Sequence, residues 1–362
     1  MDDRFLGRDD VRMLWSSSVF EPTAMVMDDL QRFHDNADKY LAVSNAWGHS
    51  KLLAAIALRY GVEPSNVITT NGASNGIYLT CRAHLKPGDH VIIESPCYEP
   101  LRASPAFIGA DISYLERHFP DYWIDLDQLD NLMRPDTRLI ILTNLHNPSG
   151  TLMDDSQLLE IARVAKAKNK NVKIVVDEIY HDFLPDIPRP VATLDDCFIT
   201  LNSLTKVYGL GLLFCGWIIA DEATIKPIRE LQVVVEGSNS RLMHSFITYI
   251  FQQLDTYHKR AIEHSKNNLE ILSQFLQPLI DKGIITGQFP RYGCIYFPRF
   301  PGLDNTDMLV KRLADEYKTF VVPGRYFNQP QHIRIGFGGP TEKLKANLEV
   351  FVEAVQKVLA LG

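Results

Sequence analysis

Short apolar runs alternate with helical patterns along the first two thirds of the chain. The runs are rich in β-branched residues and occupy positions 66–70, 90–94, 138–143, 172–177, 198–202 and 215–220. One helical pattern fills residues 154–169, and another begins at Ser50, a predicted cap, and ends at Gly61. Strands that are apolar on both faces and alternate with helices indicate a mostly parallel sheet covered on two sides. The pattern therefore predicts an α/β fold.

The pattern changes after about residue 240. Helical stretches at roughly 242–282 and 340–361 flank two strand-like segments, CIYFPRF and TFVVPG, which we interpret as parts of a smaller α+β domain. The first 40 residues are irregular and rich in Ser and Asp, so we expect an arm that lies against another part of the molecule. The expected division is an arm at 1–39 that joins the small domain, a large domain at 40–250, and a small C-terminal domain at 251–362.

Composition limits the partners and the compartment. The chain has 362 residues and a formal net charge of −7, without the positive surface that nucleic acids or anionic membranes need. Its longest apolar stretch, at 210–220, is too short to span a bilayer. Five scattered cysteines are typical of reduced cytosolic thiols, and the N-terminus has no signal-peptide pattern, so we expect a cytoplasmic protein. The histidines form no metal-binding pair, so no metal site is predicted.

Two predicted strands are followed by turns that suit a ligand site. Ligands of parallel sheets bind outside the carboxyl ends of the strands. Residues 71–76 read NGASNG, and such small residues at a helix start leave free N–H groups that attract phosphate. Residues 144–150 read NLHNPSG, a turn that projects an amide. Taken alone, each segment is also explained by an ordinary connecting turn.

Two charged residues follow the next two strands. Asp177 ends a buried strand, where an acid either caps a neighbour or meets a cationic ligand. Lys206 lies in an apolar segment punctuated by glycines, although lysine is rarely buried. Burial would lower the pKa of this amine and make it a nucleophile for carbonyl groups. The alternative is a lysine that reaches the surface, which fits this context poorly.

The order of these four motifs is more specific than any one of them. A small-residue turn, then N-P-x-G, then D-E-x-Y, then S-x-x-K resembles the fold-type I pyridoxal 5′-phosphate (PLP) enzymes, and within them the class I/II aminotransferases. The resemblance covers roughly residues 40 to 340. It implies a large PLP-binding domain and a homodimer with shared active sites. It also implies amino-group transfer between an α-amino acid and a 2-oxo acid.

The resemblance also implies roles for residues around the cofactor ring. Lys206 holds the cofactor as a Schiff base and, when its amine is free, moves a proton between the substrate Cα and the cofactor C4′. Asp177 pairs with the pyridine nitrogen and keeps it protonated, so that the ring absorbs electrons. Asn147 and Tyr180 hydrogen-bond the O3′ atom, and Tyr98 stacks on the ring.

Further roles concern the phosphate and the substrate. Ala73, Ser74 and Ser203 match phosphate-binding positions of the family, and Tyr40 matches a tyrosine that reaches the phosphate of the neighbouring subunit. Arg334 matches the arginine that takes the substrate α-carboxylate as a planar fork, with Asn147 beside it. No residue for the substrate side chain is assigned, although Arg325 is a candidate.

One position departs from the family pattern. The family has an arginine that grips the phosphate eight residues after the lysine, and here Phe214 occupies that place. A charged hydrogen bond contributes roughly 1.5–3 kcal/mol, so its loss weakens cofactor binding by about 10- to 100-fold. Either another donor compensates, with Thr205 the nearest and residues 238–240 of a partner subunit further candidates, or ring contacts and the Schiff base hold PLP.

Two alternatives to amino-group transfer stay open. The same scaffold supports other reactions of a substrate carbanion, such as elimination, decarboxylation or cyclisation, because the surrounding pocket decides its fate. A non-catalytic PLP-binding sensor is the second alternative. It is disfavoured because no DNA-binding helix pair precedes the domain and because Lys206, Asp177 and Arg334 are all present.

Overall fold

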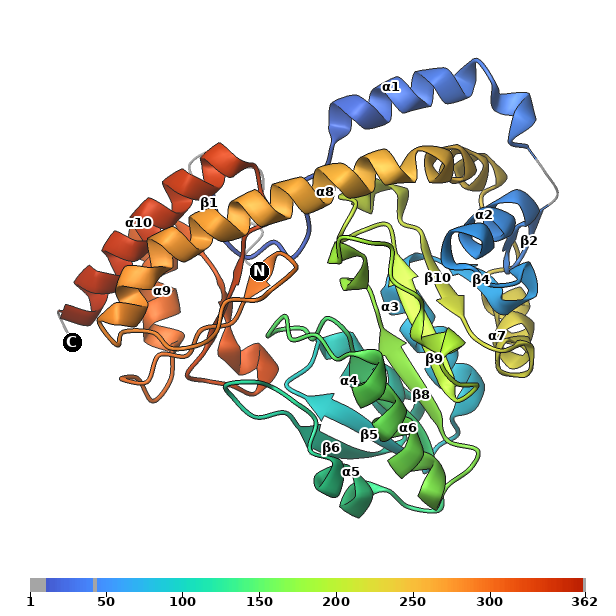
Figure 1. Ribbon diagram of the computed structural model, residues 1–362, viewed down its shortest axis with the longest axis horizontal. Coiled ribbons are helices and arrows are strands. Elements are labelled where there is room, and N and C mark those ends of the chain that lie inside the picture. Colours follow the sequence, from blue (N-terminus) through green and yellow to red (C-terminus); the bar gives the residue numbers. More distant parts are fainter. Residues whose placement is uncertain (1–10, 42–43, 361–362) are drawn as a thin grey trace.

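The computed structural model describes residues 11–41 and 44–360 and has a large and a small part joined by one long helix (Figure 1). The large part is built on a seven-stranded sheet in the order β4-β10-β9-β8-β7-β5-β6. Six of these strands run parallel, and β10 runs antiparallel to both of its neighbours. The strands are β4 (Val67–Thr70), β5 (His90–Ser95), β6 (Asp111–Glu116), β7 (Thr137–Thr143), β8 (Lys173–Asp177), β9 (Phe198–Ser203) and β10 (Gly216–Ile219).

Helices cover both faces of this sheet, as the two-sided apolar strands predict. One face packs against α3 (Gly72–His84), α4 (Glu99–Ile108) and α7 (Glu222–Val235). The other packs against α5 (Leu126–Leu132) and α6 (Asp155–Lys168), and near β10 against α2 (Ser50–Tyr60) and the start of α8 (Arg241–Asp281). A short hairpin of β2 (Ser44–Asn45) and β3 (Gly48–His49) leads into α2. The predicted α/β class with a mostly parallel sheet is confirmed.

Local sequence explains where several of these elements begin and end. Asp154 caps α6 in a reciprocal capping box with Gln157, and Gly61 ends α2 in the left-handed conformation that glycine tolerates best. The expectation that Ser50 caps α2 is wrong, because His49 is the cap residue and Ser50 is the first helical residue. Strand β6 was not expected, because it is an edge strand whose residues are mostly half-buried or exposed.

The small part contains a three-stranded antiparallel sheet in the order β11-β14-β13, packed against helices (Figure 1). Helix α8, 41 residues long, runs from the large part into the small part and continues through residue 250, where the expected boundary lies. The remaining elements are α9 (Asp307–Tyr317), α10 (Thr341–Ala360), β11 (Ile295–Tyr296), β12 (Thr319–Phe320), β13 (Val322–Pro323) and β14 (Ile333–Gly336).

The N-terminal segment touches both parts of the molecule. Strand β1 (Arg12–Met13) pairs in parallel with β12 of the small part. The expectation of an irregular arm is wrong for α1 (Thr23–His34), a helix that lies along α8 (Figure 1). Asp29 of α1 accepts hydrogen bonds from Tyr249 at 3.2 Å and Tyr257 at 2.6 Å, which fix α1 on α8. Residues 1–10 of the expected arm lie outside the described residues.

Candidate active site

The predicted site residues gather at the carboxyl edge of the large sheet. Asp177 is the last residue of β8, and Lys206 lies three residues beyond the end of β9. Asn147 follows β7, and the start of α3 follows β4. Because parallel strands end on the same edge, four segments far apart in the sequence deliver their side chains to one place.

Lys206 is half-buried at this edge. Its Nζ atom donates a hydrogen bond to Oγ of Ser17 at 3.3 Å. Burial lowers the pKa of the Lys206 amine, and the positive charge of Arg334 lowers it further, while the neighbouring Cys294 and Asp177 oppose this effect. The amine is therefore more readily neutral, and more nucleophilic, than an ordinary lysine.

Asp177 is buried beside Lys206. Burial raises the pKa of the Asp177 carboxyl to about 7, and the neighbouring carboxyls of Glu94 and Glu178 add to the rise. The backbone N–H of Ile179 donates to its Oδ1 at 3.2 Å, and Lys206 also acts to keep the carboxylate charged. A cationic group placed against Asp177 would favour its ionised form.

Arg334 enters the site from β14 of the small part. Its Nη1 donates to Oδ1 of Asn147 at 2.9 Å, and its Nη2 donates to the carbonyl of Trp15 at 3.4 Å. The guanidinium lies over the ring of Phe327, 5.3 Å from the ring centroid. The Nε atom is buried without a hydrogen-bond partner among the described residues. A buried donor without a partner is costly, so this arginine has capacity for an anion.

Tyr180 and Tyr98 flank these charged groups. Burial raises the pKa of the Tyr180 phenol, and Arg334, Cys294 and Ser17 all lie near enough to shift it. Tyr98 precedes α4, is 38% exposed, and lies close enough to Arg334 to act on its charge. The structure thus brings Lys206, Asp177, Asn147, Tyr98, Tyr180 and Arg334 into one neighbourhood.

Of the predicted phosphate residues, Ala73, Ser74 and Ser203 lie around the start of α3. No side chain caps this helix, so its first N–H groups are available to an anion. Gly216 of β10 packs so closely against it that a Cβ there would lie 2.7 Å from the carbonyl carbon of Gly72 and 2.9 Å from the nitrogen of Ala73. Ser203, which pairs with Gly216, accepts a hydrogen bond from the backbone of Thr205 at 3.1 Å.

Phe214 lies two residues before this contact. It ends a short 3₁₀ turn (Gly211–Leu213) in the left-handed conformation, with φ 48°, and its side chain is 65% exposed. The ring therefore does not fill the core. The position where the family has an arginine is open to solvent and to the start of α3.

Two other predicted residues and one predicted segment lie elsewhere in this chain. Tyr40 donates to Oε1 of Gln252 at 2.9 Å and packs on Tyr249 of α8, and none of its described contacts joins it to Lys206 or Arg334. Arg325 pairs with Asp307 on the surface rather than entering the site. In the 238–240 segment, Asn239 donates to the carbonyl of Ala46, and Ser240 caps α8.

Sequence reasoning missed three residues of this neighbourhood. Trp15 and Ser17 reach it because β1 pairs with β12, a contact between segments about 300 residues apart. Cys294 lies next to Lys206 and Arg334 in the small part, and burial raises the pKa of its thiol to about 12. The S-S-S run at residues 16–18 was the only local signal, and it carries no specific chemistry.

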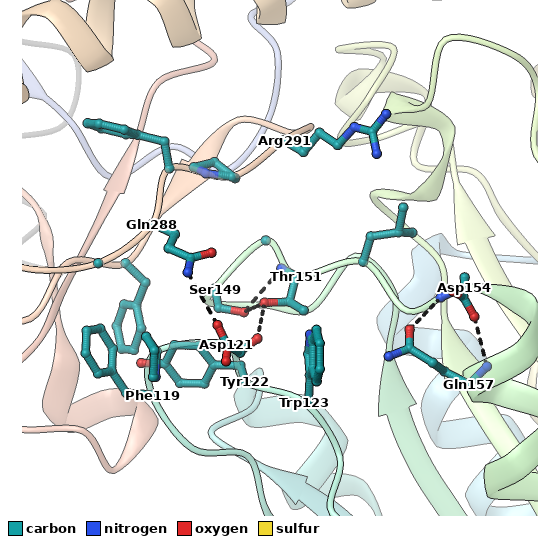
Figure 2. A pocket seen from close by; sticks show the side chains of 17 residues that line it. Phe119, Asp121, Tyr122, Trp123, Ser149, Thr151, Asp154, Gln157, Gln288 and Arg291 are labelled. Atoms are coloured by element: carbon teal, nitrogen blue, oxygen red, sulfur yellow. Dashed lines mark hydrogen bonds between the residues drawn. The ribbon is translucent and has the colours of Figure 1, made fainter.

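A cavity of about 530 Å³ lies on the other side of the Asn147 loop, between the large and small parts. Figure 2 shows Trp123 and Tyr122 beside the Ser149–Thr151 loop, with Arg291 across from them. Oγ of Ser149 lies 2.6 Å from Nδ1 of the buried His146, which links the cavity wall to the residue before Asn147. The cavity adjoins the site without containing Lys206 or Arg334 in its lining.

Across residues 11–41 and 44–360, no three His, Cys, Asp or Glu side chains gather in a way that would hold a metal ion. Over the same residues, no helix has the length and apolar character needed to cross a bilayer.

A lysine, an aspartate and an arginine that meet at the carboxyl edge of a mostly parallel sheet define the class of fold-type I PLP enzymes. Within that class, the chain belongs to the family described as aminotransferase class I and II, whose model matches residues 13–351. Pyridoxal 5′-phosphate is the cofactor of this family. The expected fold and cofactor are thereby confirmed.

The proteins that this chain resembles include an aminotransferase, a synthase and a cyclase. A capreomycidine synthase from Streptomyces vinaceus is 28% identical over 311 residues, 84% of this chain and 79% of that protein. An aspartate aminotransferase from Sulfolobus acidocaldarius is 25% identical over 358 residues, 91% of this chain and 87% of that protein. Among solved structures, the PLP-dependent cyclase OrfR in complex with Au has a TM-score of 0.86 at 25% identity, covering 98% of this chain and 96% of that chain.

The donor groups at the site fit this cofactor. The uncapped start of α3 and the hydroxyls of Ser74, Ser203 and Thr205 suit a phosphate, although no cation accompanies them in the family's position. Asp177 suits a protonated ring nitrogen, and the amine of Lys206 suits an aldehyde. The unpartnered Nε of Arg334 suits a carboxylate beyond the ring.

Proposed function

We propose that the protein is a PLP-dependent aminotransferase that moves the amino group between an α-amino acid and a 2-oxo acid. The observation that carries the proposal is the convergence of Lys206, Asp177 and Arg334 in one desolvated site. An amine, a ring-nitrogen partner and a carboxylate receptor are the three groups that the reaction needs. When bound, the cofactor supplies an electron sink for negative charge at the substrate Cα.

Lys206 is proposed as the group that moves the proton. Burial and the charge of Arg334 lower the pKa of its amine, which makes Nζ more readily neutral and able to accept the proton that leaves the substrate Cα. The same nitrogen would hold this proton and could return it within the site, where the cofactor, when bound, would supply the acceptor.

Asp177 is proposed to hold the proton on the ring nitrogen. Buried carboxylates are costly, and a pKa of about 7 records that cost in the chain alone. A cation against Asp177 lowers this pKa again, so the carboxylate and the protonated ring stabilise each other. The protonated ring is the better electron acceptor.

Arg334 is proposed to orient the substrate through its α-carboxylate. Two of its nitrogens are occupied by Asn147 and Trp15, and Nε is unpartnered. A substrate carboxylate that bound at Nε and displaced one of these two neutral partners would form two parallel charged hydrogen bonds with Arg334. The carboxylate held in this way fixes which bond at Cα faces Lys206.

A homodimer in the cytoplasm is also part of the proposal. Apolar side chains at the end of α7 and the start of α8 are exposed in the single chain, namely Val233, Val234, Val235 and Leu242. They flank residues 238–240, the segment that the family resemblance assigns to the partner's phosphate. All five cysteines are buried free thiols, as a reducing compartment allows.

Cyclisation is the second candidate reaction. It is favoured by the likeness to a capreomycidine synthase and to the cyclase OrfR, and by Phe214 at the arginine position. In a cyclase the amino group stays with the product, whereas in an aminotransferase it stays on the cofactor. The two reactions thus differ in where the nitrogen is found after one turnover.

Single-turnover experiments separate these candidates. The protein loaded with PLP is mixed with each protein amino acid in turn, without a 2-oxo acid. Amino-group transfer predicts loss of the visible cofactor band, release of a 2-oxo acid, and recovery of pyridoxamine 5′-phosphate. A product that retains its nitrogen, with the visible band restored, would replace this proposal with cyclisation or elimination.

A further inference from the structure

The segment Leu14–Phe20 crosses the active site between the two parts of the molecule. The backbone N–H of Val19 donates to the carbonyl of Lys206 at 2.9 Å, and that of Phe20 donates to the carbonyl of Gly338 at 2.9 Å. At the other end, Leu14 donates to Phe320 at 2.9 Å and accepts from Gly336 at 2.8 Å. The segment is therefore anchored on both sides of Ser17.

Two glycines of the small part make this path available. A Cβ on Gly336 would lie 2.0 Å from the carbonyl oxygen of Ser16, and one on Gly338 would lie 2.1 Å from that of Ser18. Contacts this short are backbone clashes that no rotamer change relieves, so any other residue would displace the segment. Ser17, between these two close approaches, is held against Nζ of Lys206 at 3.3 Å.

We propose that Ser17 is a further catalytic residue, which holds the free amine of Lys206 while that amine accepts and returns the Cα proton. The proposal rests on the amino-group chemistry assigned above. Ser17 Oγ accepts a hydrogen bond from Nζ and neither gains nor loses a proton itself. The proton taken from Cα makes Nζ an ammonium, and Ser17 then accepts a hydrogen bond from one of its N–H groups.

The hydroxyl matters because little else in the site accepts a hydrogen bond from this amine. Cys294 and Asp177 act on Lys206 through their charge or polarity, and Nζ has no hydrogen bond other than that to Ser17 among those of the described residues. A charged amine forms stronger hydrogen bonds than a neutral one, so Ser17 stabilises the protonated state. Its removal leaves the ammonium poorly solvated and its direction undefined.

Two measurements on Ser17→Ala test the proposal, with Ser18→Ala as the matched control. The side chain of Ser18 contacts the hydroxyl of Ser16 rather than Lys206. First, the PLP-loaded protein is incubated in D2O with an equimolar mixture of the protein amino acids, and exchange of each α-proton is followed by NMR. Ser17→Ala is expected to slow exchange about tenfold without weakening amino acid binding. Ser18→Ala should match the parent protein.

The second measurement does not depend on turnover. The rate at which cofactor-free protein combines with PLP is followed across about pH 6 to 10 by visible absorbance. Loss of an acceptor for the ammonium is expected to move the midpoint of this profile downward by about half a pH unit in Ser17→Ala only.

The outcomes separate the two proposals. If no amino acid exchanges in the parent protein, the proposed function fails, and the pH profile alone decides the role of Ser17. Unchanged exchange together with an unchanged midpoint in Ser17→Ala would show that the hydroxyl only packs against Lys206. If Ser18→Ala changes the exchange rate and the midpoint as much as Ser17→Ala does, the cause is a shift of the Leu14–Phe20 segment. That result would also overturn a role for the Ser17 hydroxyl.

Discussion

Replacement of Phe214 by arginine puts a positive charge beside the start of α3. Phe214 is 65% exposed and already adopts a left-handed backbone, so the substitution empties no core space and adds no new strain. Gly216, two residues further on, touches Gly72 and Ala73. Two residues span at most about 7 Å, which an extended arginine side chain bridges. The guanidinium can therefore reach an anion at the helix start.

The expected gain in PLP affinity follows from the charge of the phosphate. One charged hydrogen bond contributes about 1.5–3 kcal/mol, which corresponds to roughly 10- to 100-fold in the dissociation constant. Exposure to solvent places the expected result nearer the lower value, because water screens the pair. The parent protein should correspondingly lose PLP on dialysis more readily than Phe214→Arg.

Titration of cofactor-free protein with PLP and with pyridoxal isolates the phosphate. Phe214→Arg should bind PLP at least about tenfold more tightly, and its affinity for pyridoxal, which lacks the phosphate, should not change. Leu212→Arg is the matched control, because it adds the same charge to an exposed position of the same turn. Equal gains for both cofactors, equal gains in both variants, or no gain at all would refute the reasoning.

Three further variants and one pH experiment test the site. Lys206→Ala should abolish the borohydride-reducible bond between PLP and protein, as detected by mass spectrometry of the reduced protein; a surviving bond would implicate another lysine. Asp177→Ala should retain the fold, seen by circular dichroism, and lose most turnover, and near-normal turnover would place the ring-nitrogen partner elsewhere. Arg334→Lys should raise KM for the amino acid by about tenfold or more with little change in PLP affinity, because an ammonium cannot reproduce the planar fork; parallel loss of PLP would assign Arg334 to the cofactor. Because the pKa of Asp177 is raised on folding to about 7 from about 3.9, cofactor-free protein should lose stability as pH rises between these values. Thermal melts against pH should show this slope in the parent and not in Asp177→Asn, and identical slopes would contradict a strongly raised pKa.

Much of the large part was predictable because its strands are buried on both faces. The runs that became β5, β7, β8 and β9 each contain a largely apolar, buried stretch, so they stand out in the sequence whatever surrounds them. Helix α1 was not predictable from the sequence, because its buried face of Val26, Asp29 and Phe33 includes a carboxylate. That carboxylate is satisfied by two tyrosines of α8, a long-range contact that no local pattern reveals.

Some residues of the site could likewise be predicted from the sequence, and others could not. Asp177 and Lys206 were identifiable because each follows a strand, and strand ends of a parallel sheet meet. Ser17 and Trp15 were not, because their segment reaches the site through the pairing of β1 with β12 and the absence of side chains at Gly336 and Gly338. Long-range pairing and space left by glycine are properties of the folded chain.

The shape of helix α8 affects how the large and small parts of the molecule are placed around the site. It spans 41 residues, about 60 Å at the usual rise of an α-helix, and it extends from the part that holds Lys206 into the part that holds Arg334. A bend of about 5° at its middle moves either end by roughly 2.6 Å. A small change in the curvature of α8 would therefore change how the part that holds Lys206 faces the part that holds Arg334.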